Sequence, residues 1–244
     1  MAEVEVSTSG DVVTIRLNRP DKRNAITAAM YTTLADALIA AEASAAAVVV
    51  LTGAGGTFTA GNDLQDMREN PPVGDNPSPV RFLAALTGLH AVLVAAVDGP
   101  AIGVGTTVLL HCDLVYATSR STFRLPFVDL GLVPEAASTL LLPRLVGHLR
   151  AAELMLFGET IDADTAANVG MVTAVVADGT ALDQLVAERT AALVDKPRAA
   201  VRATKGLLID STTHTVPARL ALDRRVLQSL LPPTPDRAHD DDRR

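Results

Sequence analysis

The feature that most constrains the fold of this chain is a pattern that occurs twice: an apolar run, a glycine-rich turn, and then a segment with helical character. The first copy joins Val48–Thr52 to the turn GAGGTFTAGND, and the second joins Ala91–Val97 to the turn DGPAIGVG. Short apolar runs bounded by glycine are typical of buried strands. Each copy therefore predicts a buried strand that passes through a tight turn into a helix.

Such a turn exposes backbone N–H groups at the first residues of a helix, where the helix dipole also favours negative charge. The site can hold an anion, or an oxygen that becomes anionic during a reaction. Alternatively, the glycines only allow a helix to pack closely against a strand. Two turns of this kind could direct one N–H each at the same oxygen.

Composition and charge narrow the classes of function. The 244 residues suffice for one or two domains. Apolar residues make up 48% but aromatic residues only 3%, so the core must consist mainly of alanine, valine and leucine. The net charge of −7 and the lack of a basic stripe argue against a nucleic-acid partner. A strongly anionic ligand would need a local cluster of lysine and arginine.

The chain has one cysteine, Cys112, which lies in an apolar run and is expected to be a small core residue. A single cysteine forms no intrachain disulfide, which fits a reducing compartment. The N-terminal residues lack the pattern of a secretory signal, and no apolar run is long enough to cross a bilayer. We therefore expect a cytoplasmic protein without a membrane partner.

Strands and helices alternate along most of the chain, which predicts an α/β fold. After about residue 180 the pattern becomes helical, with helices expected over 182–193, 197–210 and 218–231. This change divides the chain into a core (1–180), a C-terminal helical subdomain (181–231) and a disordered tail (232–244).

The two turns contain motifs that resemble those of the crotonase, or enoyl-CoA hydratase/isomerase, superfamily. The first has the form A-G-x-D at residues 60–63, and the second has the form G-x-A-x-G-x-G at residues 99–105. The resemblance extends from about Val4 to about Leu208. It implies a spiral of β-β-α units with a helical C-terminus that builds a homotrimer or a dimer of trimers. It also implies an acyl-CoA thioester as substrate, with no metal and no cofactor beyond the coenzyme A of that substrate.

The same resemblance assigns residues to the site. The backbone N–H groups of Asn62 and Val104 would form an oxyanion hole. Asp63 is expected to cap a helix rather than to take part in catalysis. The other substrate-contacting positions in the two turns would be Ala60, Gly61, Asp63, Leu64 and Gly103.

Coenzyme A would be held by residues outside the two turns. Lys22 and Arg23 could meet its phosphates, and Ala25 lies where backbone contacts to the thioester end are expected. Lys205 matches a lysine that reaches the phosphate of coenzyme A on a neighbouring subunit. Each of these charged residues could instead be an ordinary solvated side chain.

The acid–base residues distinguish the reactions of this superfamily. Hydratases carry two glutamates, and here Thr107 and Phe127 occupy their positions. A carboxylate occurs instead at Glu135, after Pro134 in the segment GLVPEAAS, at the start of a helix expected over 135–145. Glu135 could be an ordinary first-turn glutamate. It also matches the catalytic glutamate of peroxisomal-type 3-enoyl-CoA isomerases, and an apolar acyl pocket should raise its pKa.

These observations predict an enoyl-CoA isomerase of fatty acid metabolism and β-oxidation that converts a 3-enoyl-CoA to a 2-enoyl-CoA, with Glu135 as the proton shuttle. An enoyl-CoA hydratase or another crotonase-type enzyme is the alternative. A third hypothesis is a non-catalytic acyl-CoA-binding subunit. The proline-rich segment from Pro71 to Pro79 is a candidate lid. Chain length and double-bond geometry of the substrate are left open.

Overall fold

The computed structural model describes residues 2–71, 77–210 and 215–230. The chain forms two compact units, residues 1–196 and 197–244. This division places the helix Gly179–Val194 in the first unit, whereas the sequence-based boundary lies at residue 180. The predicted tail, 232–244, and most of the candidate lid lie outside the described residues. No helix in the described ranges is both long and apolar enough to cross a membrane.

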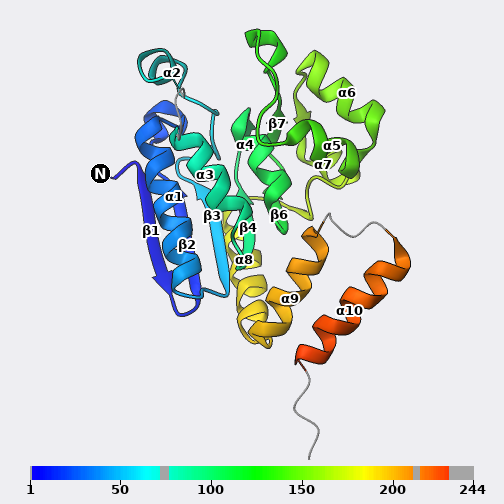
Figure 1. The fold of residues 1–244 in the computed structure, drawn as a ribbon. Helices are drawn as coiled ribbons and strands as arrows, with labels where there is room; N and C mark the ends of the chain where they lie inside the picture. The colour runs from blue at the N-terminus through cyan, green and yellow to red at the C-terminus, as the bar shows by residue number, and fades with distance from the viewer. Residues whose placement is uncertain (1, 72–76, 211–214, 231–244) are drawn as a thin grey trace, which may run out of the picture. The chain divides into compact units, whose positions relative to one another are not determined.

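Figure 1 shows the elements in chain order. The strands are β1 (Val4–Ser9), β2 (Val12–Leu17), β3 (Val48–Gly53), β4 (Val92–Val97), β5 (Pro100–Ile102), β6 (Leu114–Thr118), β7 (Thr122–Arg124), β8 (Ile161–Asp162) and β9 (Ala174–Val176). The α-helices are α1 (Ala28–Ala43), α2 (Leu64–Glu69), α3 (Ser78–Thr87), α4 (Val104–Thr107), α5 (Ser138–Val146), α6 (His148–Phe157), α7 (Ala163–Asn168), α8 (Gly179–Val194), α9 (Arg198–Ile209) and α10 (Val216–Leu230). Three short 3₁₀ helices are η1 (Pro20–Lys22), η2 (Val108–His111) and η3 (Val128–Leu130).

The main sheet has the strand order β1-β2-β3-β4-β6-β9. β1 and β2 form an antiparallel hairpin, and every later pair in the sheet is parallel. All six residues of β4 are buried, as are the first four of β3. A parallel strand covered on both faces needs such an uninterrupted apolar sequence. The predicted α/β fold is confirmed.

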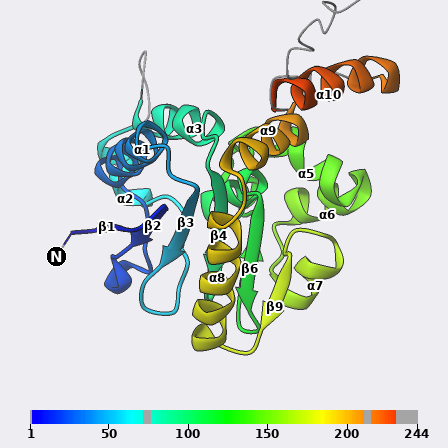
Figure 2. The ribbon, with the colours of Figure 1, turned by 90° about the horizontal axis from the view of Figure 1, so that it is seen from below.

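Helices cover both faces of this sheet. α1 and α3 pack against each other and, with the odd-numbered side chains of the strands such as Ile15, Leu51 and Leu93, form the main core. α8 contacts β3, β4 and β6 from the opposite face, where even-numbered residues such as Val50 lie (Figure 2). The alternation of side chains along a strand is what separates these two layers.

A smaller sheet, β5-β7-β8, begins within the second glycine-rich turn, which contains β5. β5 pairs in parallel with β7, so that Ala101 lies opposite Phe123. On its other side, Ala101 forms a parallel bridge with Thr59 in the first turn. This bridge brings the two glycine-rich turns together, although they are about 40 residues apart in the chain.

Two predicted helices differ from the observed ones. The helix expected to begin at Glu135 begins at Ser138, because Ala136 and Ala137 have left-handed backbone conformations, with φ of 56° and 53°. A residue with positive φ cannot continue a right-handed helix. Pro143 lies inside this helix, which ends before Gly147. The helix predicted to follow the second glycine-rich turn is a single turn, α4, followed by the 3₁₀ helix η2.

Candidate active site

The two glycine-rich turns are joined by backbone hydrogen bonds. The N–H of Ile102 donates to the carbonyl of Thr59 at 3.0 Å, and the N–H of Thr59 donates to the carbonyl of Pro100 at 3.1 Å. The first turn is held on its other side by Ile26, whose N–H donates to the carbonyl of Gly61 at 2.8 Å. The turns therefore form one continuous, hydrogen-bonded layer.

Gly61 makes the close approach of the turns possible. It has φ of 90°, and a Cβ at this position would lie 2.7 Å from the carbonyl oxygen of Ile102. Any side chain would push the turns apart. Asn62 follows Gly61, and Val104 follows Gly103; the two glycines lie side by side, because a Cβ on Gly61 would be 3.8 Å from the Cα of Gly103. Among the described residues, neither N–H has a hydrogen-bond acceptor.

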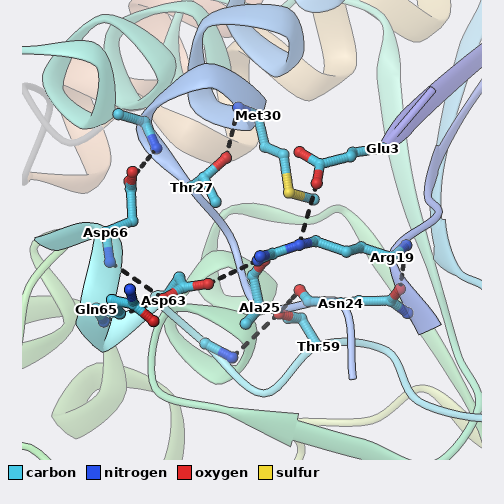
Figure 3. A network of polar contacts seen from close by, with 12 residues as sticks. Glu3, Arg19, Asn24, Ala25, Thr27, Met30, Thr59, Asp63, Gln65 and Asp66 are labelled. Carbon is cyan, nitrogen blue, oxygen red and sulfur yellow. Dashed lines mark hydrogen bonds and ion pairs between the residues drawn. The ribbon is translucent and has the colours of Figure 1, made fainter. Parts of the chain in front are cut away.

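A buried asparagine, Asn24, lies beside the first turn (Figure 3). Asn24 is fully buried, and its side-chain amide donates to the carbonyls of Ala54 and Thr57 at 2.9 and 2.7 Å. The hydroxyl of Thr59 donates to the Asn24 carbonyl at 2.6 Å and accepts a hydrogen bond from the N–H of Gly61 at 3.0 Å. Buried polar groups that are all paired in this way fix one conformation of a loop.

An ion pair fixes the other end of the turn (Figure 3). Asp63 caps α2 by accepting from the N–H groups of Gln65 and Asp66, as the sequence predicts. Arg19 donates to the Asp63 carboxylate at 2.7 Å and to the carbonyl of Ala25 at 3.1 Å. The hydrogen bond from Arg19 lowers the pKa of Asp63. Asp63 is thus a structural residue that holds the backbone on the C-terminal side of Asn62.

A cavity of about 290 Å³ opens beside the first turn. It is lined by Ile26, Ala28, Tyr31, Asn62, Asp66, Met67, Asn70, Pro71, Pro77, Ser78, Pro79 and Glu135. Three of these side chains form a hydrogen-bonded chain. The Tyr31 hydroxyl donates to Oδ1 of Asn62 at 2.5 Å, and Nδ2 of Asn62 donates to Oε1 of Glu135 at 3.4 Å. The Asn62 side chain therefore links a buried phenol to the carboxylate.

Burial controls the protonation of Glu135 and Tyr31. Removal from solvent raises the pKa of Glu135, and the hydrogen bond from Asn62 partly opposes that rise. The pKa of Tyr31 is raised well above its usual value by burial and, to a lesser extent, by the charge of Glu135. A carboxyl group with a raised pKa is suited to accept and return a proton near neutral pH. The prediction that the pKa of Glu135 is raised is confirmed.

A second carboxylate, Asp66, also lines the cavity. Its Oδ2 accepts from the N–H of Ala28 at 2.7 Å, and its Oδ1 accepts from the side chain of Asn70 at 2.9 Å. Both oxygens of Asp66 are therefore committed to structural hydrogen bonds. Glu135, with one long hydrogen bond from Asn62, is the more available base of the two.

Other predicted site residues lie away from the cavity. Thr107 is fully buried, and its hydroxyl donates to the carbonyl of Val104 at 3.3 Å, within its own helix. Phe127 is buried in the core. The predicted substrate contacts of Thr107 and Phe127 find no support in the lining of this cavity, because both side chains are used in packing.

The candidate coenzyme A contacts are distributed over the surface and the turns. Lys22 and Arg23 are exposed, and Ala25 is half-buried. Lys205 lies on α9, in the second compact unit, so the described site does not include it. Near the turns, Ala60 donates its N–H to the carbonyl of Arg23, Leu64 is 45% exposed at the start of α2, and Pro134 is half-buried.

The sequence analysis did not identify Tyr31, Arg19 and Asn24 as residues of the site. Tyr31 precedes Leu34 and follows Met30 in the apolar stripe of α1, and a tyrosine in such a stripe was a usable signal because its hydroxyl needs a partner when buried. Arg19 and Asn24 lie in a polar loop, and the sequence around them gives no indication that they differ from solvated residues.

Comparison with known proteins identifies the family of the chain. Residues 7–234 match the sequence profile of the enoyl-CoA hydratase/isomerase family. The chain is 36% identical over 234 residues to human enoyl-CoA delta isomerase 2, covering 93% of the chain and 59% of that protein. It is 34% identical over 239 residues to 2,3-dehydroadipyl-CoA hydratase of Escherichia coli K12, covering 97% and 93%.

A solved structure shows the same fold with a ligand. It is that of a protein assigned as an enoyl-CoA hydratase, from Thermobifida fusca YX, in complex with acetoacetyl-CoA. The TM-score is 0.83 and the identity 34%, over 93% of this chain and 94% of the other. The chain belongs to the enoyl-CoA hydratase/isomerase family of enzymes. It spans little more than half the length of the human isomerase that it matches.

Proposed function

We propose that this protein isomerises a 3-enoyl-CoA thioester to the 2-enoyl-CoA, with Glu135 as the base and the N–H groups of Asn62 and Val104 as the oxyanion hole. The observation that carries the proposal is the position of Glu135. Its carboxylate lies in the cavity beside Asn62, is largely withdrawn from solvent, and has a raised pKa.

The reaction needs one carboxylate. Glu135 takes a proton from the α-carbon of the 3-enoyl thioester, and the thioester oxygen becomes an enolate oxygen. The two free N–H groups donate to that oxygen and stabilise the charge. The protonated Glu135 then delivers its proton to the γ-carbon, which leaves the double bond between the α- and β-carbons. The proton that Glu135 removes balances the proton that it returns.

The side chain of Asn62 fits this scheme. Its Oδ1 accepts from Tyr31, so its Nδ2 must face Glu135 as a donor. Donation to the carboxylate orients the base and limits the rise of its pKa. The backbone and the side chain of Asn62 would thus serve the enolate and the base, respectively.

Hydration is the second candidate, because the chain covers 93% of the E. coli 2,3-dehydroadipyl-CoA hydratase. Hydration requires a water that is positioned and deprotonated, together with a proton for the α-carbon. In the hydratases of this superfamily two glutamates share that work, and here Thr107 and Phe127 stand in their places. The buried, backbone-bonded hydroxyl of Thr107 cannot activate a water molecule in the cavity.

The test compares two assays on one enzyme. We expect turnover of a trans-3-enoyl-CoA to exceed hydration of a trans-2-enoyl-CoA. Glu135→Gln should lower isomerase kcat by about 10²–10⁴, as loss of a general base does. Glu188→Gln, on the exposed surface of α8, is the matched control and should keep the rate. Faster hydration by the wild type would favour the second candidate. CoA-ester binding without turnover would identify a non-catalytic binding subunit.

A further inference from the structure

The turn that carries Glu135 adopts an unfavourable backbone conformation. Ala136 and Ala137 both have positive φ, a conformation that alanine rarely adopts because its Cβ crowds the following carbonyl. The hydroxyl of Ser138 is fully buried and has no partner among the described residues. Residues in such conformations persist only when surrounding contacts hold them.

One of these contacts comes from His111. Its Nε2 lies 2.8 Å from the carbonyl oxygen of Ala136. A carbonyl can only accept, so Nε2 carries the proton and donates it. A second contact is the N–H of Ser138, which donates to the carbonyl of Glu135 at 3.0 Å. The side-chain bond from His111 is the contact that a substitution can remove without changing the turn itself.

The position of His111 in the chain connects two parts of the site. His111 is the last residue of η2, which continues directly from α4, and α4 begins at Val104. One short helical stretch therefore has a candidate oxyanion-hole donor at its first residue and a hydrogen bond to the Glu135 turn at its last. The same stretch can set the distance between the enolate site and the base.

We propose that His111 is a positioning residue: its Nε2–H holds the carbonyl of Ala136, keeps the strained turn in place, and thereby directs the Glu135 carboxylate into the cavity. The inference rests on the proposed function for its kinetic consequence. Without this bond, Ala136 can return to negative φ, and the adjacent residue, Glu135, then moves. A displacement of about 1 Å at a reacting group can cost about 10² in rate.

The experiment uses two amide replacements that differ by one methylene. In His111→Gln the amide nitrogen reaches the place of Nε2, whereas in His111→Asn it stops near the place of Nδ1. We expect His111→Asn to lower kcat by about 10²-fold with little change in KM, and His111→Gln to retain most of the rate. His148→Asn, at the exposed start of α6, is the matched control. Equal losses in the Gln and Asn variants, or wild-type kcat in the Asn variant, would overturn the proposal.

A second variant tests the turn without changing His111. It also tests the positioning role if His111→Asn does not fold. Ala136→Gly removes the steric penalty of positive φ but lets the turn adopt other conformations. We expect a lower kcat without a lower melting temperature; an unchanged kcat contradicts the proposal. Crystal structures separate this inference from the proposed function. If the wild type fails to isomerise, a displaced Glu135 in His111→Asn but not in His111→Gln still supports the positioning role, and an unmoved Glu135 refutes it.

Discussion

The hydroxyl of Tyr31 donates a 2.5 Å hydrogen bond to Oδ1 of Asn62, and this contact determines which end of the Asn62 amide faces Glu135. Without it, the Asn62 amide would be held only by its 3.4 Å hydrogen bond to Glu135, and its orientation beside the carboxylate would be less fixed. The phenol is well suited to this role, because burial and the nearby charge of Glu135 both raise the pKa of Tyr31 and keep it a donor.

Replacing Tyr31 by phenylalanine should therefore lower kcat by about fivefold, the equivalent of one ordinary hydrogen bond of about 1 kcal/mol. The KM for the acyl-CoA should change little, because the ring and its packing against Phe82 remain. Steady-state kinetics measure both quantities. Tyr116→Phe, on β6, is the control. An unchanged kcat in Tyr31→Phe would show that Asn62 keeps its orientation without the phenol.

Glu135 should give the reaction a characteristic dependence on pH. The base must be ionised to accept the α-proton, so kcat/KM should fall as the pH drops through the pKa of Glu135. Because burial raises this pKa, the acid limb should lie at higher pH than that of an ordinary glutamate. A pH–rate profile with its acid limb in the ordinary range of a glutamic acid would argue that another group is the base.

The same shift predicts an effect on stability. A carboxyl group with a higher pKa in the folded state binds more protons when folded, so its contribution to the free energy of unfolding falls as the pH rises from the unfolded pKa through the folded pKa. Glu135→Gln removes this penalty. Its melting temperature should exceed that of the wild type at neutral pH, and the difference should shrink below the unfolded pKa. Thermal unfolding at several pH values measures this, and a constant difference would contradict it.

The oxyanion hole can be tested at Val104 without breaking a backbone hydrogen bond. Val104 is the first residue of α4, where proline is tolerated, and its N–H has no acceptor among the described residues. Val104→Pro should lower kcat by about 10²–10³, the cost of one lost donor. Val104→Ala keeps the N–H and is the control. Equal, mild effects of the two substitutions would mean that this N–H does not serve the enolate.

Asn62→Ala does not test the backbone N–H of Asn62 alone, as the sequence suggests that it would. From the motif alone, only the backbone N–H of Asn62 matters, and alanine should keep much of the activity. In the structure, the side chain also donates to Glu135 and accepts from Tyr31. Asn62→Ala should therefore reduce kcat measurably, by at least the roughly fivefold expected for one hydrogen bond, and Asn62→Pro should reduce it further.

Much of the fold could be predicted because its signals are local. The buried strands β3 and β4 are uninterrupted apolar runs, and the caps Thr27 and Asp63 accept hydrogen bonds from the helices that they begin. Apolar runs and caps depend on neighbouring residues, which a sequence displays directly. The conformation of Ala136 could not be predicted this way. Nothing in GLVPEAAS requires positive φ, and the turn depends on contacts from a distant part of the chain, such as His111.

In the candidate site, too, the features encoded by neighbouring residues could be predicted, and those that depend on distant residues could not. The motifs indicate Asn62 and Val104 because glycine-rich turns have a recognisable composition. The partners of these residues come from elsewhere: Tyr31 from α1, and Glu135 from the segment before α5. A hydrogen bond between residues 31 and 62 is a product of tertiary packing, and a single sequence carries no signal of it.

Assembly is the remaining prediction. Three large side chains on α6 are mostly exposed to solvent in the single chain: Leu149 by 84%, Leu156 by 63% and Phe157 by 68%. An apolar cluster of this kind is typical of a surface that another molecule covers. We expect a trimer or a dimer of trimers at micromolar concentration, measured by light scattering.

The double substitution Leu149→Lys and Phe157→Lys should lower the measured mass, because burying two unpaired charges in an interface is costly. Val6→Lys provides the control, since Val6 is 49% exposed on β1 at the edge of the sheet, where lysine is a common residue. Its mass should match that of the wild type. A wild-type protein that is monomeric at micromolar concentration would refute the assembly, and a mass unchanged by the double substitution would place the interface on another surface.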